Sequence, residues 1–206
     1  MGMPAIRRRW TPEDVRQLNV DTPSWPRYEL IGGELLVTPS PGSPHQLAAG
    51  ELYLAIAPYV EAEGIGLTFF APSDVELREG TITQPDLYVI AAGPEAHEKG
   101  LVSPDAPALL LVVEVISPSS VRTDRVIKRD YYMESGVAEY WVMDLDARII
   151  ERWTPNNDTP LVERARLAWH PAGAAHSLDV ELPEFFDRVR QKSAWMAKLG
   201  PGRAGR

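Results

Sequence analysis

The sequence predicts an α/β protein in which helices flank a central mixed β-sheet, and three observations support this fold class. Residues 109–116 form a run rich in β-branched side chains and closed by turn formers, which indicates a strand buried on both faces. Short strand-like segments precede and follow this run. Two longer stretches with helix signals, 45–63 and 121–135, lie among them, and this alternation is typical of a sheet with helical cover.

The composition is that of one globular, cytoplasmic domain. The 206 residues are 44% hydrophobic and 24% charged, which is sufficient for one sizeable core. Cysteine is absent, which excludes disulfides and thiolate metal sites and makes a cytoplasmic location the default. No apolar run is long enough to span a membrane, and the first residues do not resemble a signal peptide. We expect one domain over residues 1–206, with a core over about 10–190 and flexible termini.

The charge balance limits the modes of nucleic-acid binding. A net charge of −8 argues against a non-specific nucleic-acid coat, although a locally basic cleft stays open. The basic segments Arg7–Arg9 and 188–206 are interpreted as solvated termini.

The amino-terminal segment predicts a short helix followed by a hairpin. Thr11 and Pro12 suit the N-cap and first position of a helix that continues to Leu18. Strand-like segments at 28–31 and 34–37 flank two glycines, which is a hairpin pattern.

A long helix and several strands follow. The helix is expected from His45 to Glu63, and Pro58 should bend or shorten it. Residues 91–107 are rich in Gly, Pro and Ala and should form a surface loop. Candidate strands lie at 66–70, 74–78 and 86–90.

The carboxyl-terminal half predicts a helix, a second hairpin and peripheral elements. The helix over 121–135 should end before Gly136, because glycine readily adopts the left-handed backbone found at helix ends. Residues 139–144 and 148–153 form the predicted hairpin. The remainder should supply peripheral strands and a short final helix near Phe185.

Glu114 is the most informative residue, because it places a carboxylate inside the apolar run. A buried ionised carboxylate is costly unless a metal, a cation or hydrogen bonds compensate its charge. The partner could be a metal ion or a buried arginine. The sequence therefore predicts a charge-binding site in the middle of the sheet.

Asp86 and Lys128 complete a candidate catalytic group with Glu114. Asp86 opens a strand, and two carboxylates on adjacent strands would suit Mg²⁺ or Mn²⁺, completed by water and a substrate phosphate. Lys128, on the following helix, could hold a phosphate oxygen or help to deprotonate the attacking water. Tyr132, one turn further on, could orient a phosphate or serve only in packing. Together these residues point to metal-assisted phosphodiester hydrolysis.

A structural role for Lys128 is also open. On a helix surface it would pair with Asp124 at i,i+4, a weak stabilising interaction. The catalytic hypothesis predicts that Lys128→Ala abolishes cleavage and changes the free energy of unfolding by no more than about 0.5 kcal/mol, as for a surface change.

Six motifs occur in an order that resembles a known family. The chain is similar to the Uma family of restriction-endonuclease-like proteins, part of the PD-(D/E)XK nuclease superfamily, from about residue 10 to 190. The motifs are Tyr28-Glu29-Leu30-Ile31-Gly32-Gly33-Glu34-Leu35, Ser43-Pro44-His45-Gln46, Phe70-Ala71-Pro72, Gln84-Pro85-Asp86-Leu87, Val113-Glu114-Val115-Ile116-Ser117-Pro118-Ser119 and Glu139-Tyr140-Trp141-Val142-Met143-Asp144.

The resemblance implies a restriction-endonuclease-like core in which Asp86 and Glu114 are metal ligands. The superfamily pattern places a lysine two residues after the glutamate, where this chain has Ile116. The family resembles other members in which that lysine has moved to the following helix, and Lys128 is the match.

Two further residues lie in family motifs. Glu34 could add a third carboxylate or could remain an exposed charge on the hairpin. His45 could contact substrate or cap its helix, and the structural role is favoured.

The leading functional hypothesis is a Mg²⁺-dependent endonuclease that acts on DNA. The alternatives are a catalytically silent nucleic-acid- or protein-binding module on the same fold, and a phosphodiesterase for a small nucleotide. A homodimer would allow both strands to be cut. Tyr140, Trp141 and Trp153 could form its interface, although alternating strand residues are more often core.

Overall fold

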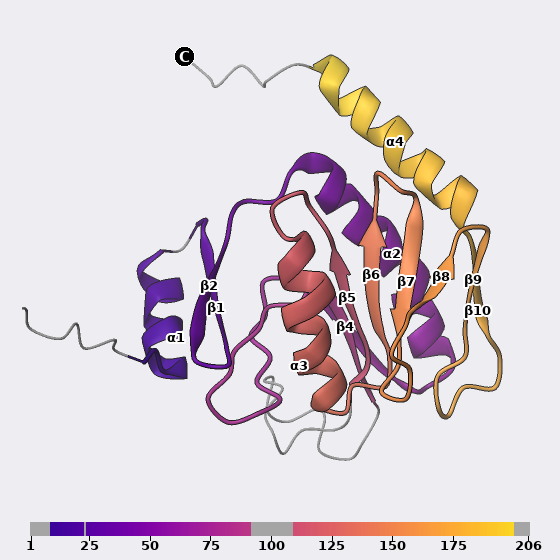
Figure 1. Cartoon of the computed structure of the whole chain (residues 1–206). Helices are drawn as coiled ribbons and strands as arrows, with labels where there is room; N and C mark the ends of the chain where they lie inside the picture. Colours follow the sequence, from indigo (N-terminus) through magenta and orange to yellow (C-terminus); the bar gives the residue numbers. More distant parts are fainter. Residues whose placement is uncertain (1–8, 23, 92–108, 200–206) are drawn as a thin grey trace, which may run out of the picture.

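The computed structural model describes residues 9–22, 24–91 and 109–199 and shows a six-stranded mixed sheet between layers of helices (Figure 1). The sheet has the order β3-β4-β5-β6-β7-β8. The β5–β6 pair is parallel and the other neighbouring pairs are antiparallel, which confirms the predicted fold class. Its strands are β3 (Gly66–Phe70), β4 (Leu87–Ala91), β5 (Leu109–Val115), β6 (Tyr140–Asp144), β7 (Ile149–Trp153) and β8 (Leu161–Glu163).

Two small antiparallel sheets accompany the large one. The predicted hairpin is formed by β1 (Arg27–Ile31) and β2 (Glu34–Thr38), and a second pair by β9 (Arg166–Trp169) and β10 (Leu178–Glu181). The β1–β2 turn has φ values of 60° and 80° at its two glycines, a conformation that other residues adopt only with strain.

Helices cover both faces of the large sheet (Figure 1). The helix α2 packs a row of apolar side chains spaced four residues apart into the core, among them Leu52 and Ile56. No helix within the described ranges is long and apolar enough to cross a membrane. The helices are α1 (Pro12–Asp21), α2 (Ser43–Ala62), the π-helix η1 (Thr123–Lys128), α3 (Arg129–Glu134) and α4 (Leu182–Leu199).

The strand β5 is central, and all seven of its residues are buried, as its apolar run predicts. Side chains alternate between the two faces of a strand, so Glu114 and Val112 share one face. Val112 packs in the cluster that contains Tyr131 and Tyr132 of α3. Glu114 therefore points toward the layer formed by η1 and α3.

The structure corrects the strand expected at 74–78 and the short final helix, and it adds detail to the two other helices. Residues 74–78 form no strand, because their pairing is limited to one isolated bridge between Val75 and Thr83. The helix predicted over 121–135 begins with a π-helical segment, and Pro58 does not shorten α2. The final helix α4 is 18 residues long, because Arg188 and Lys192 pair with Glu51 of α2 and extend it beyond its apolar first turns.

Other predictions fall on the core or outside the described residues. Tyr140, Trp141 and Trp153 are buried, which confirms that they belong to the core. The loop expected over 91–107 lies, apart from its first residue, outside the described residues, as do the extreme termini.

Candidate active site

The pairing of β4 with β5 brings the two predicted carboxylates together. The antiparallel register pairs Leu87 with Val113, and one residue further along it places Asp86 opposite Glu114. Residues directly opposite on antiparallel strands have neighbouring side chains. Asp86 Oδ2 also accepts a hydrogen bond of 2.8 Å from the backbone N–H of Val115, which fixes the aspartate at the end of β5.

Lys128 joins these acids from η1. Its Nζ donates to Glu114 Oε1 at 2.9 Å, and only 3% of the residue is exposed. The interpretation of Lys128 as a surface lysine is therefore wrong, and so is the expectation that its removal would act as a surface change. Removing one partner of a buried ion pair leaves an uncompensated buried charge and typically costs about 3–5 kcal/mol. The π-helical geometry is itself often found at functional sites.

Glu29 on β1 is the principal site residue that sequence reasoning did not identify. Its Oε1 lies 3.0 Å from Lys128 Nζ and accepts a 2.7 Å hydrogen bond from the backbone N–H of Gln84. Its Oε2 accepts a hydrogen bond from Thr38, and the residue is only 2% exposed. The sequence held one signal for Glu29, which is that it lies in the first family motif, residues 28–35, between apolar residues of the hairpin.

Asp124 is the fourth carboxylate of the site and is buried like Glu29 and Glu114. It is 4% exposed, and its Oδ1 lies 3.9 Å from Lys128 Nζ. The i,i+4 spacing of Asp124 and Lys128 in the sequence predicted an ion pair on the helix surface. The structure places both residues in the interior.

His45, near the start of α2, contacts Asp86. Its Nε2 lies 3.0 Å from Asp86 Oδ2, while its buried Nδ1 has no hydrogen-bond partner among the residues that the structure describes. Burial lowers the pKa of His45, but the hydrogen bond and charge of Asp86, with the charge of Asp124, outweigh burial and raise it above the usual value.

These residues line one cavity of about 650 Å³. Its walls come from the β1–β2 hairpin, the start of α2, the segment that precedes β4, and the end of β5 with the segment that leads into η1. Tyr132 is fully buried, with its hydroxyl 3.4 Å from Glu114 Oε1. Glu34 is not brought to the cavity, because it lies exposed at the hairpin turn.

Negative charge exceeds positive charge at this site. We call Glu29, Asp86, Glu114 and Asp124 the acid cluster; the cations beside it are Lys128 and, when protonated, His45. Burial raises the pKa of Glu114 well above its usual value, despite the Lys128 ammonium, and the neighbouring acids raise it further. Burial opposes protonation of Lys128, but the facing carboxylates hold its pKa well above its usual value.

The donor set fits a hard divalent cation with few protein ligands. Both hydrogen bonds to Glu114 reach Oε1, and both polar contacts of Asp86 reach Oδ2. The other two oxygens, Glu114 Oε2 and Asp86 Oδ1, thus have no donor among the described residues. Within those same residues, no three His, Asp or Glu side chains converge on a common ion position. Magnesium ions often use one or two carboxylates and complete their shell with water and phosphate.

Comparisons with known proteins support the observed fold. The model of the family Uma2, described as putative restriction endonuclease, matches residues 12–189. No curated protein sequence matches the chain. A solved structure of a putative nuclease belonging to DUF820 from Anabaena variabilis superposes with a TM-score of 0.69 at 18% sequence identity. The match covers 87% of this chain and 99% of that one, and it shows that the two share a fold.

Proposed function

Because the chain belongs to the Uma2 family of putative restriction endonucleases, we propose that it is a metal-dependent nuclease that hydrolyses phosphodiester bonds in DNA. The observation that carries this proposal is the acid cluster, in which four carboxylates, three of them buried, line a cavity with only two cations beside them, Lys128 and His45. Buried carboxylates in excess destabilise a fold unless a cation compensates them. Strongly perturbed titratable groups in a cleft are typical of functional sites.

In this proposal Asp86 and Glu114 hold Mg²⁺ or Mn²⁺ through the oxygens that no described donor reaches. When bound, the ion supplies Lewis-acid polarisation of the phosphate. His45 and the Val115 N–H orient Asp86, since both contact its Oδ2.

Lys128 has the charge and position to act on the phosphate. An ammonium has three N–H donors, and Glu114 and Glu29 accept from it at 2.9 and 3.0 Å. In this proposal its remaining donor stabilises the negative charge that develops on the phosphate in the transition state. Glu29 positions the ammonium from the hairpin side.

The direct test is cleavage of labelled DNA in Mg²⁺, in Mn²⁺ and in EDTA. We expect wild-type cleavage only with metal, its loss in Glu114→Gln, and unchanged cleavage in Glu34→Gln, a control carboxylate exposed on the hairpin. A wild type that is inactive with both metals on varied DNA would overturn the proposal and favour the silent module.

A further inference from the structure

The lining of the cavity is not limited to the acid cluster. Trp25 also lines it, with 37% of its surface exposed, and the guanidinium of Arg27 lies 5.8 Å from the Trp25 ring centroid. Val37 of β2, which is 57% exposed, is a further lining residue. An exposed aromatic ring beside a cation is the chemistry on which nucleic-acid bases stack.

The size of the cavity suits a short piece of one strand. A volume of about 650 Å³ lies within the range of pockets that enclose most of the surface of a small ligand. Carboxylates and Lys128 line it together with Trp25, so a nucleotide stacked on the ring would present its phosphate within the same enclosure. A base inside a duplex cannot enter such an enclosure unless its nucleotide is extruded, so enzymes with enclosed sites either extrude the nucleotide or act on single strands.

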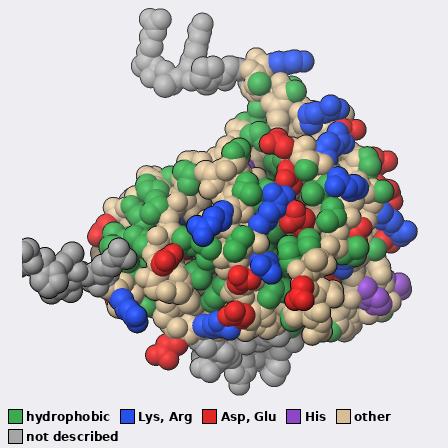
Figure 2. Space-filling model, in the orientation of Figure 1, with side chains coloured by type: hydrophobic (Ala, Val, Ile, Leu, Met, Phe, Trp, Pro, Cys, Tyr) green, Lys and Arg blue, Asp and Glu red, His purple; other side chains and the backbone are tan. Residues whose placement is uncertain are grey.

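The surface formed by the described residues offers few unpaired cations to the phosphates of a duplex. Most described Arg and Lys side chains lie within ion-pair distance of a carboxylate, as in Arg78–Glu134, Arg129–Asp130 and Arg166–Asp179. Figure 2 accordingly shows basic and acidic side chains interspersed on the face in view. Duplex binding depends on several cations that neutralise phosphates along a track.

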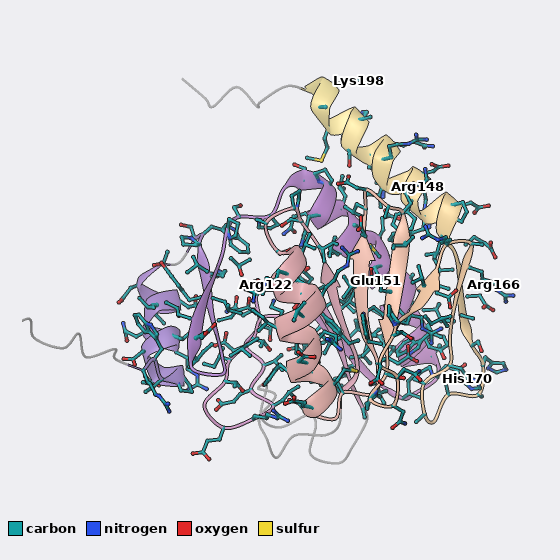
Figure 3. The ribbon with its side chains drawn as sticks, viewed as in Figure 1. Arg122, Arg148, Glu151, Arg166, His170 and Lys198 are labelled. Atoms are coloured by element: carbon teal, nitrogen blue, oxygen red, sulfur yellow. The ribbon has the colours of Figure 1, made fainter. Side chains whose placement is uncertain are left out.

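One basic side chain beside the cavity has no such pairing within the described ranges. Arg122, labelled in Figure 3, is exposed at the start of the η1 segment, between the cavity-lining residues Ser120 and Thr123. It could reach a phosphate next to the enclosed nucleotide.

We propose that the site takes single-stranded DNA, with one base stacked on Trp25 and the adjoining phosphate at Asp86, Glu114 and Lys128. This inference rests on the proposed nuclease function and names its substrate class. It makes Trp25 a residue that determines specificity and is not required for the bond-breaking step.

Fluorescence anisotropy of a labelled single strand, alone and annealed to its complement, tests the inference in Ca²⁺, with gels to verify that both remain uncut. We expect wild type to bind the single strand at least about tenfold more tightly than the duplex. Trp25→Ala should weaken single-strand binding by about tenfold to a hundredfold, the loss typical of one stacked base. Trp25→Phe should retain most of the affinity.

Matched controls separate stacking from general damage. Trp10→Ala removes a tryptophan that is 36% exposed and does not line the cavity, so its affinity should be unchanged. Val37→Glu should weaken single-strand binding without unfolding the protein. Leu161→Glu, at a residue 59% exposed on β8, should leave binding unaltered.

Equal or tighter binding of the duplex would overturn the inference, as would equal affinities for Trp25→Ala and Trp10→Ala. Cleavage of both substrates in Mg²⁺ separates the two proposals. A wild type that binds the strand through Trp25 but cuts nothing would overturn the nuclease function and support this binding mode. A wild type that cuts only the duplex would leave the nuclease standing and overturn the single-strand inference.

Discussion

Two groups of charged residues extend from the same helical segment, η1, and they differ in how their charge is compensated. Arg125 binds Asp144 and Glu151, with its Nη2 2.9 Å from Asp144 Oδ2 and its Nε 3.0 Å from Glu151 Oε1. Asp144 ends β6, and Glu151, labelled in Figure 3, lies on the adjacent strand β7. One turn further on, Lys128 faces the acid cluster.

The Arg125 group is a structural ion-pair network. Its side chains are 12–28% exposed, so water screens the remaining negative charge. The hydrogen bond with Glu151 raises the pKa of Arg125 despite its partial burial. In the acid cluster, Glu29, Glu114 and Asp124 are no more than 5% exposed, so bulk water screens their charges much less. Excess buried charge beside a cavity therefore distinguishes a candidate site from a structural ion pair.

The largest expected contrast is in stability. Lys128→Met leaves Glu29 and Glu114 buried without their cation and should lower the free energy of unfolding by about 3–5 kcal/mol. Arg125→Met leaves its two carboxylates partly hydrated and should cost about 1–2 kcal/mol. Urea unfolding at neutral pH measures both. Equal losses in the two variants would break the distinction between the groups.

The next contrast is in cleavage. Asp86→Asn keeps the shape of the side chain but removes a charge from the proposed metal site, and should lower turnover by about 10²–10³-fold. Asp144→Asn removes a carboxylate from the Arg125 group and should leave turnover unchanged. Initial rates in Mg²⁺ provide the measurement. A comparable loss in Asp144→Asn would show that the acid cluster has no special role.

Metal binding should stabilise one group and not the other. Mn²⁺ at a hundredfold of its Kd should add about 2.7 kcal/mol to the wild-type free energy of unfolding. The gain should vanish in Asp86→Asn and persist in Asp144→Asn. Thermal unfolding with and without Mn²⁺, together with calorimetric titration, measures this effect. A full gain in Asp86→Asn would place the ion elsewhere.

The smallest expected effect is a pH dependence of the metal-free protein. Burial raises the pKa of Glu114 and Asp124 more than Lys128 lowers it, so the folded state binds protons that the unfolded state releases. Stability in EDTA should therefore fall as the pH rises from about 5 to about 8. The raised pKa of His45 acts in the same direction. The lowered pKa values of Glu51 and Glu63 matter only below this window, as the pH falls through their usual values.

Melting temperatures across that range in EDTA test this expectation. Glu114→Gln should flatten the curve, because it removes the carboxylate with the strongly raised pKa. A wild-type curve that is flat or rises toward pH 8 would contradict a net excess of buried negative charge.

Local patterns in the sequence were sufficient for most elements of the fold. Thr11 caps α1 as predicted, with its side chain accepting from the Asp14 N–H. The glycine pair turns the β1–β2 hairpin, and the apolar run around Glu114 is the buried central strand. The prediction of residues 74–78 as a strand failed because β-propensity does not by itself supply a pairing partner.

The sequence by itself determined which residues are chemically unusual, because a carboxylate in a buried strand stands out against its own neighbours. It indicated Asp86, Glu114 and Lys128 in this way, with the family resemblance. For Glu29 it offered only a place in a family motif, which did not separate this residue from an ordinary polar residue on a hairpin, and it could not place Asp124 in the interior. Only the tertiary structure decided that the hairpin packs beside β5 and that η1 aims Lys128 between Glu29 and Glu114. The physical reason is that periodicity reports which face of an element is buried, whereas the packing of distant segments determines which charges meet there.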